Sequence, residues 1–139
     1  MVVFKMNAEW KKITVEAIYE NTARVATFVK DNLPKECSTK TCHQIAVAFD
    51  EIYSNVVKYS KAKQFELRLG ILKDMVYLEF IDDGIPYNPL ESEEPDVQAP
   101  KEERPIGGLG LFVVKRTMDY TEYQYKDERN IFLIGKKFL

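Results

Sequence analysis

The sequence from residue 50 to residue 59 reads Asp50-Glu51-Ile52-Tyr53-Ser54-Asn55-Val56-Val57-Lys58-Tyr59, and it belongs to a segment with helical periodicity. Apolar side chains recur at helical spacing from about residue 38 to residue 60, which predicts one long helix with a buried face. Glu51, Asn55 and Lys58 fall within a stripe about 60° wide on the flank of that helix. There they can line a polar pocket without placing charge in the core.

The three side chains of this stripe suit phosphate chemistry. The carboxylate of Glu51 could orient or deprotonate an attacking hydroxyl group. The amide oxygen of Asn55 is a suitable ligand for magnesium, and the ammonium group of Lys58 suits a phosphate. Glu51 and Lys58 taken alone would more commonly form a solvated helix face, so the stripe needs support from other parts of the chain.

Two strands are predicted after this helix. Residues 65–71 and 76–80 alternate apolar with polar side chains around a turn at Lys73-Asp74, as in an antiparallel hairpin. The second strand ends in Ile81-Asp82-Asp83-Gly84. An acid at a strand end can accept a hydrogen bond from an amine such as that of adenine, and a glycine lets the backbone turn beside a ligand. An ordinary Asp-Gly turn is the alternative interpretation.

A glycine-rich segment, Ile106-Gly107-Gly108-Leu109-Gly110-Leu111, directly precedes another predicted helix. Glycines let a backbone approach a phosphate closely, and the free amides of a helix N-terminus attract anions. The segment is not a P-loop, because no Gly-Lys-Ser/Thr follows, and it is not a Rossmann fingerprint, because no strand precedes it. A flexible hinge is the alternative interpretation.

The remaining elements complete an α+β arrangement. A strand over residues 13–17 and a helix over residues 21–32 precede the long helix. Two strands, near residues 120–125 and 131–138, close the chain. This order predicts a two-layer sandwich in which helices cover one face of a largely antiparallel, mixed sheet.

The segment between Pro86 and Pro105 differs in character from the rest of the chain. It contains five of the six prolines together with six acidic residues. Such a composition cannot bury enough apolar surface to hold itself rigid, and long loops inside small domains are often lids or binding loops.

Composition restricts the functions that the chain can have. Its 139 residues predict a single domain, 1–139. The formal net charge of -2 argues against direct nucleic-acid binding, no apolar run is long enough for a membrane span, and no signal peptide is apparent. The two cysteines are too few for a disulfide framework, which favours a cytoplasmic location.

The three motifs occur in the order and spacing found in the GHKL ATPases, and the chain resembles that superfamily over nearly its whole length. The sequence is most similar to the stand-alone anti-sigma-factor serine/threonine kinases, because it has a Glu-x-x-x-Asn pattern and an Asp-x-Gly-x-Pro-aromatic-x-Pro turn. The resemblance implies a Bergerat, or histidine-kinase-like, ATPase fold. It rests on residues 50–59, on Asp82-Asp83-Gly84-Ile85-Pro86-Tyr87-Asn88-Pro89 and on Gly107-Gly108-Leu109-Gly110-Leu111-Phe112-Val113-Val114-Lys115.

Carried over by position, the resemblance implies a general-base role for Glu51, magnesium binding by Asn55 and recognition of the adenine amine by Asp82. It implies ATP and Mg as cofactors, with an ATP lid over about residues 88–106. The ATP-binding residues that it implies are Asn55, Lys58, Asp82, Gly84, Gly107, Gly108, Leu109 and Gly110.

The sequence departs from the pattern of these relatives at three places. The small residue that often follows the magnesium-binding asparagine is Val56, and the second glycine of the Asp-x-Gly-x-Gly motif is Pro86. The last hairpin of relatives often carries a glycine-threonine pair that helps to hold adenine, whereas Asp127-Glu128-Arg129-Asn130 occupies that region here. The third departure concerns the base pocket rather than the fold.

The resemblance implies a cytoplasmic ATP-dependent serine/threonine protein kinase that binds a sigma factor, phosphorylates a STAS-type antagonist protein and forms a homodimer. Two alternatives stay open. One is a nucleotide-gated module that captures a partner protein and transfers nothing. The other is a detached histidine-kinase ATP-binding domain, against which the single histidine, His43, and the short chain both argue.

Overall fold

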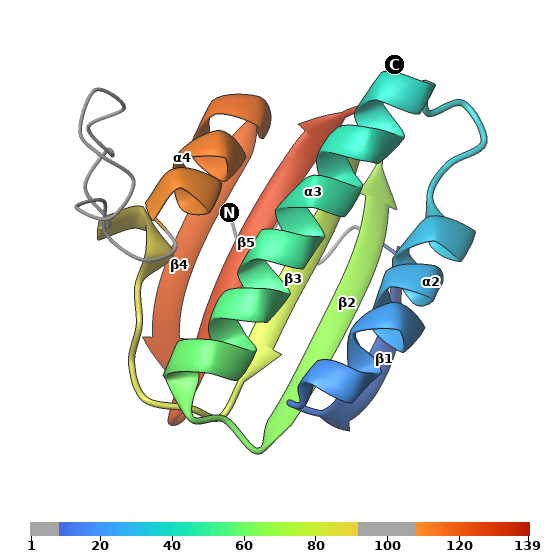
Figure 1. The fold of residues 1–139 in the computed structure, drawn as a ribbon. Coiled ribbons are helices and arrows are strands. Elements are labelled where there is room, and N and C mark those ends of the chain that lie inside the picture. The colour runs from blue at the N-terminus through green and yellow to red at the C-terminus, as the bar shows by residue number, and fades with distance from the viewer. Residues whose placement is uncertain (1–8, 92–107) are drawn as a thin grey trace.

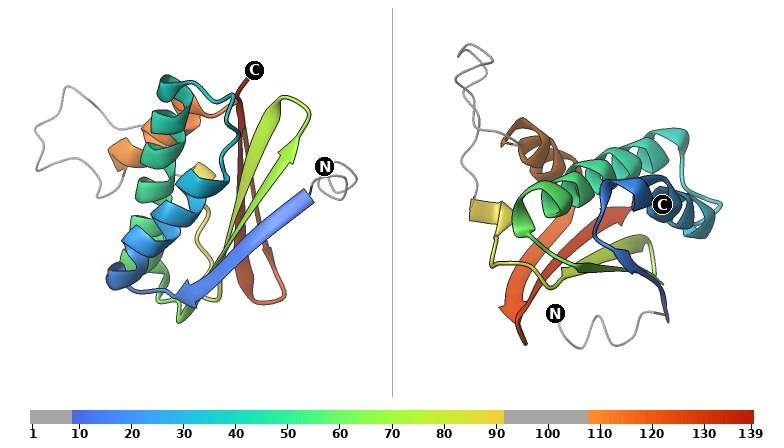
Figure 2. Two further views of the ribbon diagram at one scale, coloured as in Figure 1. Left: turned by 90° about the vertical axis from the view of Figure 1, so that its right-hand side faces the viewer. Right: turned by 60° about the horizontal axis from the view of Figure 1, so that its bottom comes forward.

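Five strands pair into one sheet in the order β1-β2-β3-β5-β4, and the helices cover one of its faces (Figure 1). The computed structural model describes residues 9–91 and 108–139. Turned edge-on, the helices form one layer and the sheet forms the other (Figure 2), so the predicted α+β two-layer fold is confirmed. The strands are β1 Glu9–Glu16, β2 Gln64–Leu72, β3 Met75–Asp82, β4 Tyr120–Lys126 and β5 Arg129–Lys137. The helices are α2 Thr22–Asn32, α3 Thr39–Asn55 and α4 Gly108–Thr117, with short helical turns η1 Tyr19–Asn21, η2 Val56–Ser60 and η3 Pro89–Glu91.

All four strand pairings of this sheet are antiparallel. The described strands therefore lack the parallel component that a mixed sheet would contain. The β4–β5 hairpin folds back so that β5 lies between β4 and β3, and its register places Asn130 opposite Asp82. This return of the chain brings the last hairpin next to the strand-end acid predicted from the sequence.

The core lies between the sheet and α3. Phe49 stacks on Tyr53 with ring centroids 5.6 Å apart, and Tyr53 meets Phe65 of β2 edge-on at 4.9 Å. Burying one such side chain contributes roughly 1.5–3 kcal/mol to stability. The predicted apolar face of α3 is thus confirmed, and its packing directs the flank that carries Asn55 toward β3.

The long helix predicted to end near Ser60 changes its geometry before that point. It is α-helical to Asn55 and continues as a single π-helical turn, η2, to Ser60. The Ser60 hydroxyl donates to Val56 O at 2.7 Å, and Ser60 O accepts from Ile85 N at 2.7 Å. Contacts with the turn after β3 therefore hold this widened turn, and π-helical turns are frequent at functional sites.

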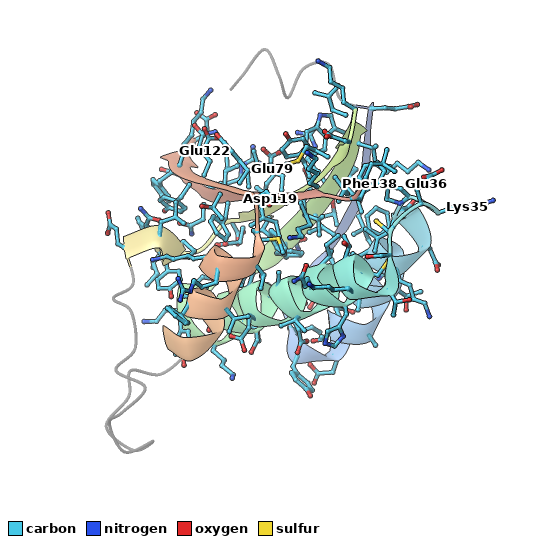
Figure 3. All side chains as sticks on the ribbon, turned by 90° about the horizontal axis from the view of Figure 1, so that it is seen from above. Lys35, Glu36, Glu79, Asp119, Glu122 and Phe138 are labelled. Carbon is cyan, nitrogen blue, oxygen red and sulfur yellow. The ribbon has the colours of Figure 1, made fainter. Side chains whose placement is uncertain are left out.

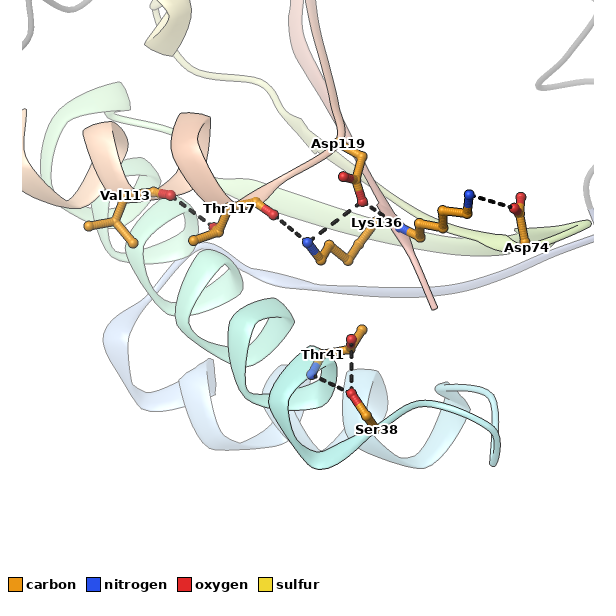
Figure 4. A network of polar contacts seen from close by, with 8 residues as sticks. Ser38, Thr41, Asp74, Val113, Thr117, Asp119 and Lys136 are labelled. Atoms are coloured by element: carbon orange, nitrogen blue, oxygen red, sulfur yellow. Dashed lines mark hydrogen bonds and ion pairs between the residues drawn. The ribbon is translucent and has the colours of Figure 1, made fainter. Parts of the chain in front are cut away.

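Helix α4 begins at Gly108, so Gly108 and Gly110 lie in its first turn and not before the helix as the sequence had suggested. Its other end is anchored to β5, where Lys136 Nζ donates to Thr117 O at 2.7 Å and pairs with Asp119 at 3.6 Å (Figure 4). A cation is favourable at the C-terminal end of a helix. This contact ties the C-terminal end of α4 to β5.

The other face of the sheet carries its own cover of polar and aromatic side chains. Seen from above, Glu79 and Glu122 lie on the side of the sheet away from the helices (Figure 3). Glu79 is buried and pairs with Arg68 at 3.3 Å, and the Arg68 guanidinium lies 5.3 Å from the Trp10 ring. None of the described helices has the length and apolar character needed to cross a lipid bilayer.

Candidate functional site

A small cavity of about 20 Å³ lies between α3, the ends of β3 and β5, and the first turns of α4. Asn55, Asp82 and Asn130 contribute its polar groups, and Tyr87 and Pro89 form part of its wall. This volume holds about one water molecule. A purine ring is larger than this volume, so the cavity must widen to admit one. The structure thus brings Asn55 and Asp82, which are distant in the sequence, to one place.

Asp82 ends β3 as a buried carboxylate with 5% of its surface exposed. Its Oδ1 accepts hydrogen bonds from Gly84 N at 2.9 Å and from Asn130 Nδ2 at 3.0 Å. Burial raises the pKa of Asp82 above its usual value, although the hydrogen bonds from Asn130 and Gly84 act to lower it. A desolvated carboxylate held in one orientation is a suitable acceptor for an amine donor on a base.

Gly84 is required by a close approach of two backbones. A Cβ atom at this position would meet the Ser60 backbone oxygen and lie 2.7 Å from both Ser60 Cβ and Ser60 Oγ. An ordinary Asp-Gly turn, the alternative interpretation of this segment, does not explain the close contact of Gly84 with η2. Gly84 shapes the site by letting the turn after Asp82 pack on the end of the helix that carries Asn55.

Gly84→Ala is expected to lower the free energy of unfolding by about 1–3 kcal/mol, because the added methyl group overpacks this contact. Urea denaturation of both proteins measures the change. Ile85→Ala is the matched control, because that side chain is exposed and its backbone bond to Ser60 survives the substitution. An unchanged midpoint for Gly84→Ala would show that the turn relaxes freely.

Asn55 is buried, with 5% of its surface exposed, and its Nδ2 has no hydrogen-bond partner among the described residues. An unsatisfied buried amide destabilises a protein by about 1–3 kcal/mol, so such a group calls for a functional explanation. Rotation of the amide by half a turn exchanges its nitrogen and its oxygen. The carbonyl oxygen would then face the same space, and it is a hard ligand of the kind that magnesium prefers. Asn55 therefore fits a magnesium ligand.

Glu51 reaches across from α3 to the first turn of α4. A Cβ atom placed on Gly110 would overlap the Glu51 carboxyl group, because Oε2 and Cδ would lie nearest to it and Oε1 would lie 2.6 Å away. The carboxylate thus lies directly against the glycine backbone near the N-terminal end of α4, where a helix carries partial positive charge. A residue with any side chain at position 110 would displace Glu51.

The structure does not bring every residue implied by the resemblance to this cavity. Lys58 is exposed on η2 and is not part of the cavity wall. Gly108 and Leu109 begin α4, whereas Gly107 and residues 92–106 of the expected lid lie outside the described residues. Within the described ranges, no three His, Cys, Asp or Glu side chains gather as a metal site.

Asn130 was not predicted as a site residue from the sequence, where it was noted only as part of a turn region that lacks a threonine. Asn130 is buried with 4% of its surface exposed, and it contacts Asp82, Tyr87 and Tyr123. A signal was present, because Asn130 shares the alternation of Phe132 and Ile134, whose side chains face the core. A polar residue on the buried face of a strand is a candidate site residue.

One end of this two-layer α+β domain holds the buried amide of Asn55, the buried carboxylate of Asp82 and the glycines that begin α4. These features fit a nucleotide-binding domain of the ATPase class. Residues 15–136 match the family described as Histidine kinase-like ATPase domain, and the chain belongs to this family. The GHKL resemblance is thereby confirmed at the level of the superfamily, and ATP binding follows from it.

The fold is also similar to a solved structure, the Acinetobacter baumannii histidine kinase AdeS. The TM-score is 0.52 at 17% sequence identity, and the match covers 99% of this chain and 72% of that chain. At this identity the likeness shows the fold alone. No match to a curated protein was found.

Proposed function

We propose that this domain is an ATP-dependent serine/threonine protein kinase of the GHKL type. The observation that carries the proposal is the contact between the Glu51 carboxylate and Gly110 near the N-terminal end of α4. A helix N-terminus is where phosphate groups bind, so a carboxylate at this place lies beside the phosphates of a bound nucleotide. Asn55 lies between Glu51 and Asp82 in the site, and Asp82 would bind the adenine base.

In the reaction, the oxygen of a serine hydroxyl group attacks the γ-phosphorus of ATP. The bond from that phosphorus to the oxygen of the ADP leaving group breaks, and the hydroxyl proton passes to Glu51. Asn55 would hold magnesium, which supplies neutralisation of phosphate charge when bound. The protein contributes mainly position and electrostatics, because phosphoryl transfer needs little covalent chemistry from it.

The partners follow from the resemblance to anti-sigma-factor kinases. We propose a STAS-type antagonist as the phosphorylated protein, a sigma factor as a second binding partner, and a homodimer in the cytoplasm as the acting form. Transfer of radiolabel from ATP to a purified STAS-type protein tests the central claim. If the domain binds ATP and captures such proteins without labelling them, the nucleotide-gated binding module is the better account.

ATP binding should depend on magnesium through Asn55. Calorimetry with a non-hydrolysable ATP analogue is expected to show binding that weakens at least about tenfold when magnesium is chelated. Asn55→Ala should weaken binding in the presence of magnesium and leave the residual, magnesium-free affinity nearly unchanged. Ser54→Ala, at the neighbouring and less buried position, is the control. Absence of heat at millimolar nucleotide would contradict the assignment of this pocket.

A further inference from the structure

We propose that Asn130 is the positioning residue that makes this pocket selective for a purine with a 6-amino group. The inference rests on the proposed binding of ATP at Asp82. Asn130 contacts the Asp82 carboxylate and not the reacting phosphate. It lies in the region where related hairpins carry a threonine.

The Asn130 side chain uses its full hydrogen-bonding capacity. Its Nδ2 donates to Asp82 Oδ1 at 3.0 Å and to Ile85 O at 2.8 Å. Its Oδ1 accepts from Tyr87 N at 2.9 Å and from the Tyr123 hydroxyl at 2.5 Å. An amide has two donor hydrogens and two acceptor lone pairs, so all four positions are taken. The network therefore determines which end of the amide faces Asp82.

This orientation places a donor permanently against one oxygen of Asp82. The same Oδ1 also accepts from Gly84 N at 2.9 Å. The carboxyl group cannot rotate without breaking both bonds, so the direction of its second oxygen is determined as well. The β3–β5 register places Asn130 opposite Asp82, so the sheet itself sets this contact, and the segment after β3 adds the bonds at Ile85 O and Tyr87 N.

A carboxylate held in this way offers only acceptor positions to a base. The 6-amino group of adenine can donate to it, whereas the 6-oxo group of hypoxanthine or guanine would place one acceptor against another. A site built around a hydrogen bond rejects a ligand that cannot make it. Without Asn130, the carboxyl group loses the contact that holds its plane, and this discrimination should weaken.

The test compares three nucleotides on the full chain by calorimetry: the β,γ-imido triphosphates of adenosine, inosine and purine riboside. They differ in the group at position 6 of the base, and the inosine compound also carries a hydrogen on N1. Wild type is expected to bind the adenosine compound at least about 100-fold more tightly than the inosine compound. Asn130→Leu, which removes the donor to Asp82 without adding a charge beside that carboxylate, should reduce this ratio at least about tenfold. Asn130→Ala should reduce it similarly.

Gln124→Ala is the matched control, because it changes an exposed side chain on the neighbouring strand of the same hairpin and leaves all four bonds to Asn130 in place. Its ratio should stay within about twofold of the wild-type ratio. A purely structural role for Asn130 would weaken binding of all three nucleotides alike and leave the ratio unchanged, and that result overturns the inference while the ATP site stands. Equal binding of the three by wild type overturns it without any variant. Failure of wild type to bind any of them overturns the ATP site and this inference together.

Discussion

Asp82→Asn is expected to weaken ATP binding at least about 100-fold while leaving the folded protein as stable as wild type or more stable. Binding should fall because the amide presents a donor where the adenine amine also presents a donor. Stability should not fall, because the substitution removes a buried charge and keeps an oxygen that can accept from Gly84 N and Asn130 Nδ2. Loss of function with no loss of stability is typical of residues that serve a ligand.

The stability difference should depend on pH in a definite direction. Burial raises the pKa of Asp82 in the folded state, with opposing hydrogen bonds from Asn130 and Gly84. A carboxyl group with a raised folded pKa binds its proton more tightly in the folded state, so it favours folding below its unfolded pKa, and this contribution is lost as the pH rises through the folded value. The gain in stability of Asp82→Asn over wild type should therefore grow from acidic to neutral pH. Urea denaturation at several pH values measures it.

Asp83 is the matched control, because it is the neighbouring aspartate and its pKa is shifted in the opposite direction. Slight burial acts to raise its pKa, but hydrogen bonds from the backbone amides of Gln64 and Lys63 lower it overall. Its ionised form therefore stabilises the fold above its unfolded pKa, and that contribution is lost as the pH falls. Asp83→Asn should keep ATP binding and lose some stability at neutral pH. If both variants lose binding equally, Asp82 is not the base-reading group.

Glu51→Gln is expected to lower phosphoryl transfer to a protein serine by about 10²–10⁴-fold, the usual contribution of a general base, with ATP affinity within about threefold of wild type. Glutamine has nearly the same shape as glutamate and can still fit against Gly110, but it cannot accept the hydroxyl proton. A group that acts mainly in the transition state affects turnover more than binding. Radiolabel transfer and nucleotide calorimetry on the same preparations separate the two effects.

Two further variants limit the interpretation of this result. Asp50→Asn changes the adjacent exposed carboxylate of the same helix and should leave transfer unchanged. Gly110→Ala keeps the carboxylate but displaces it, because the new methyl group would overlap the Glu51 carboxyl group, so transfer should fall here too. If Glu51→Gln transfers phosphate as well as wild type, Glu51 is a helix-surface residue that contacts α4 and is not the general base.

The sequence allowed the layers and several elements to be predicted because local patterns encode them. The apolar spacing of α3, including Phe49 and Ile52, marks its buried face, and alternation in β2 and β3 marks the faces of two strands. The strand-end position of Asp82 was visible for the same reason. Each of these inferences uses residues within one or two turns of one another, where side-chain direction follows directly from backbone period.

The boundaries of the helices were harder to predict from the sequence. The helix predicted to reach Ser60 changes to a π-helical turn after Asn55, and α4 includes Gly108 and Gly110, which were expected to precede it. The π-helical turn is held by the Ile85 amide, which donates to Ser60 O from a different element. Local propensity cannot report a contact of this kind, because tertiary partners override weak local preferences.

The sequence by itself therefore determined the α+β class, the polar stripe with Glu51 and Asn55, and an acid at the end of β3. Only the tertiary structure decided that Asn130 holds Asp82, across 48 residues of sequence, and that Glu51 meets Gly110. The first contact depends on the β3–β5 register and the second on the packing of α4 against α3. Both are long-range arrangements that the chain reaches by burying its apolar faces, so no local pattern of residues encodes them.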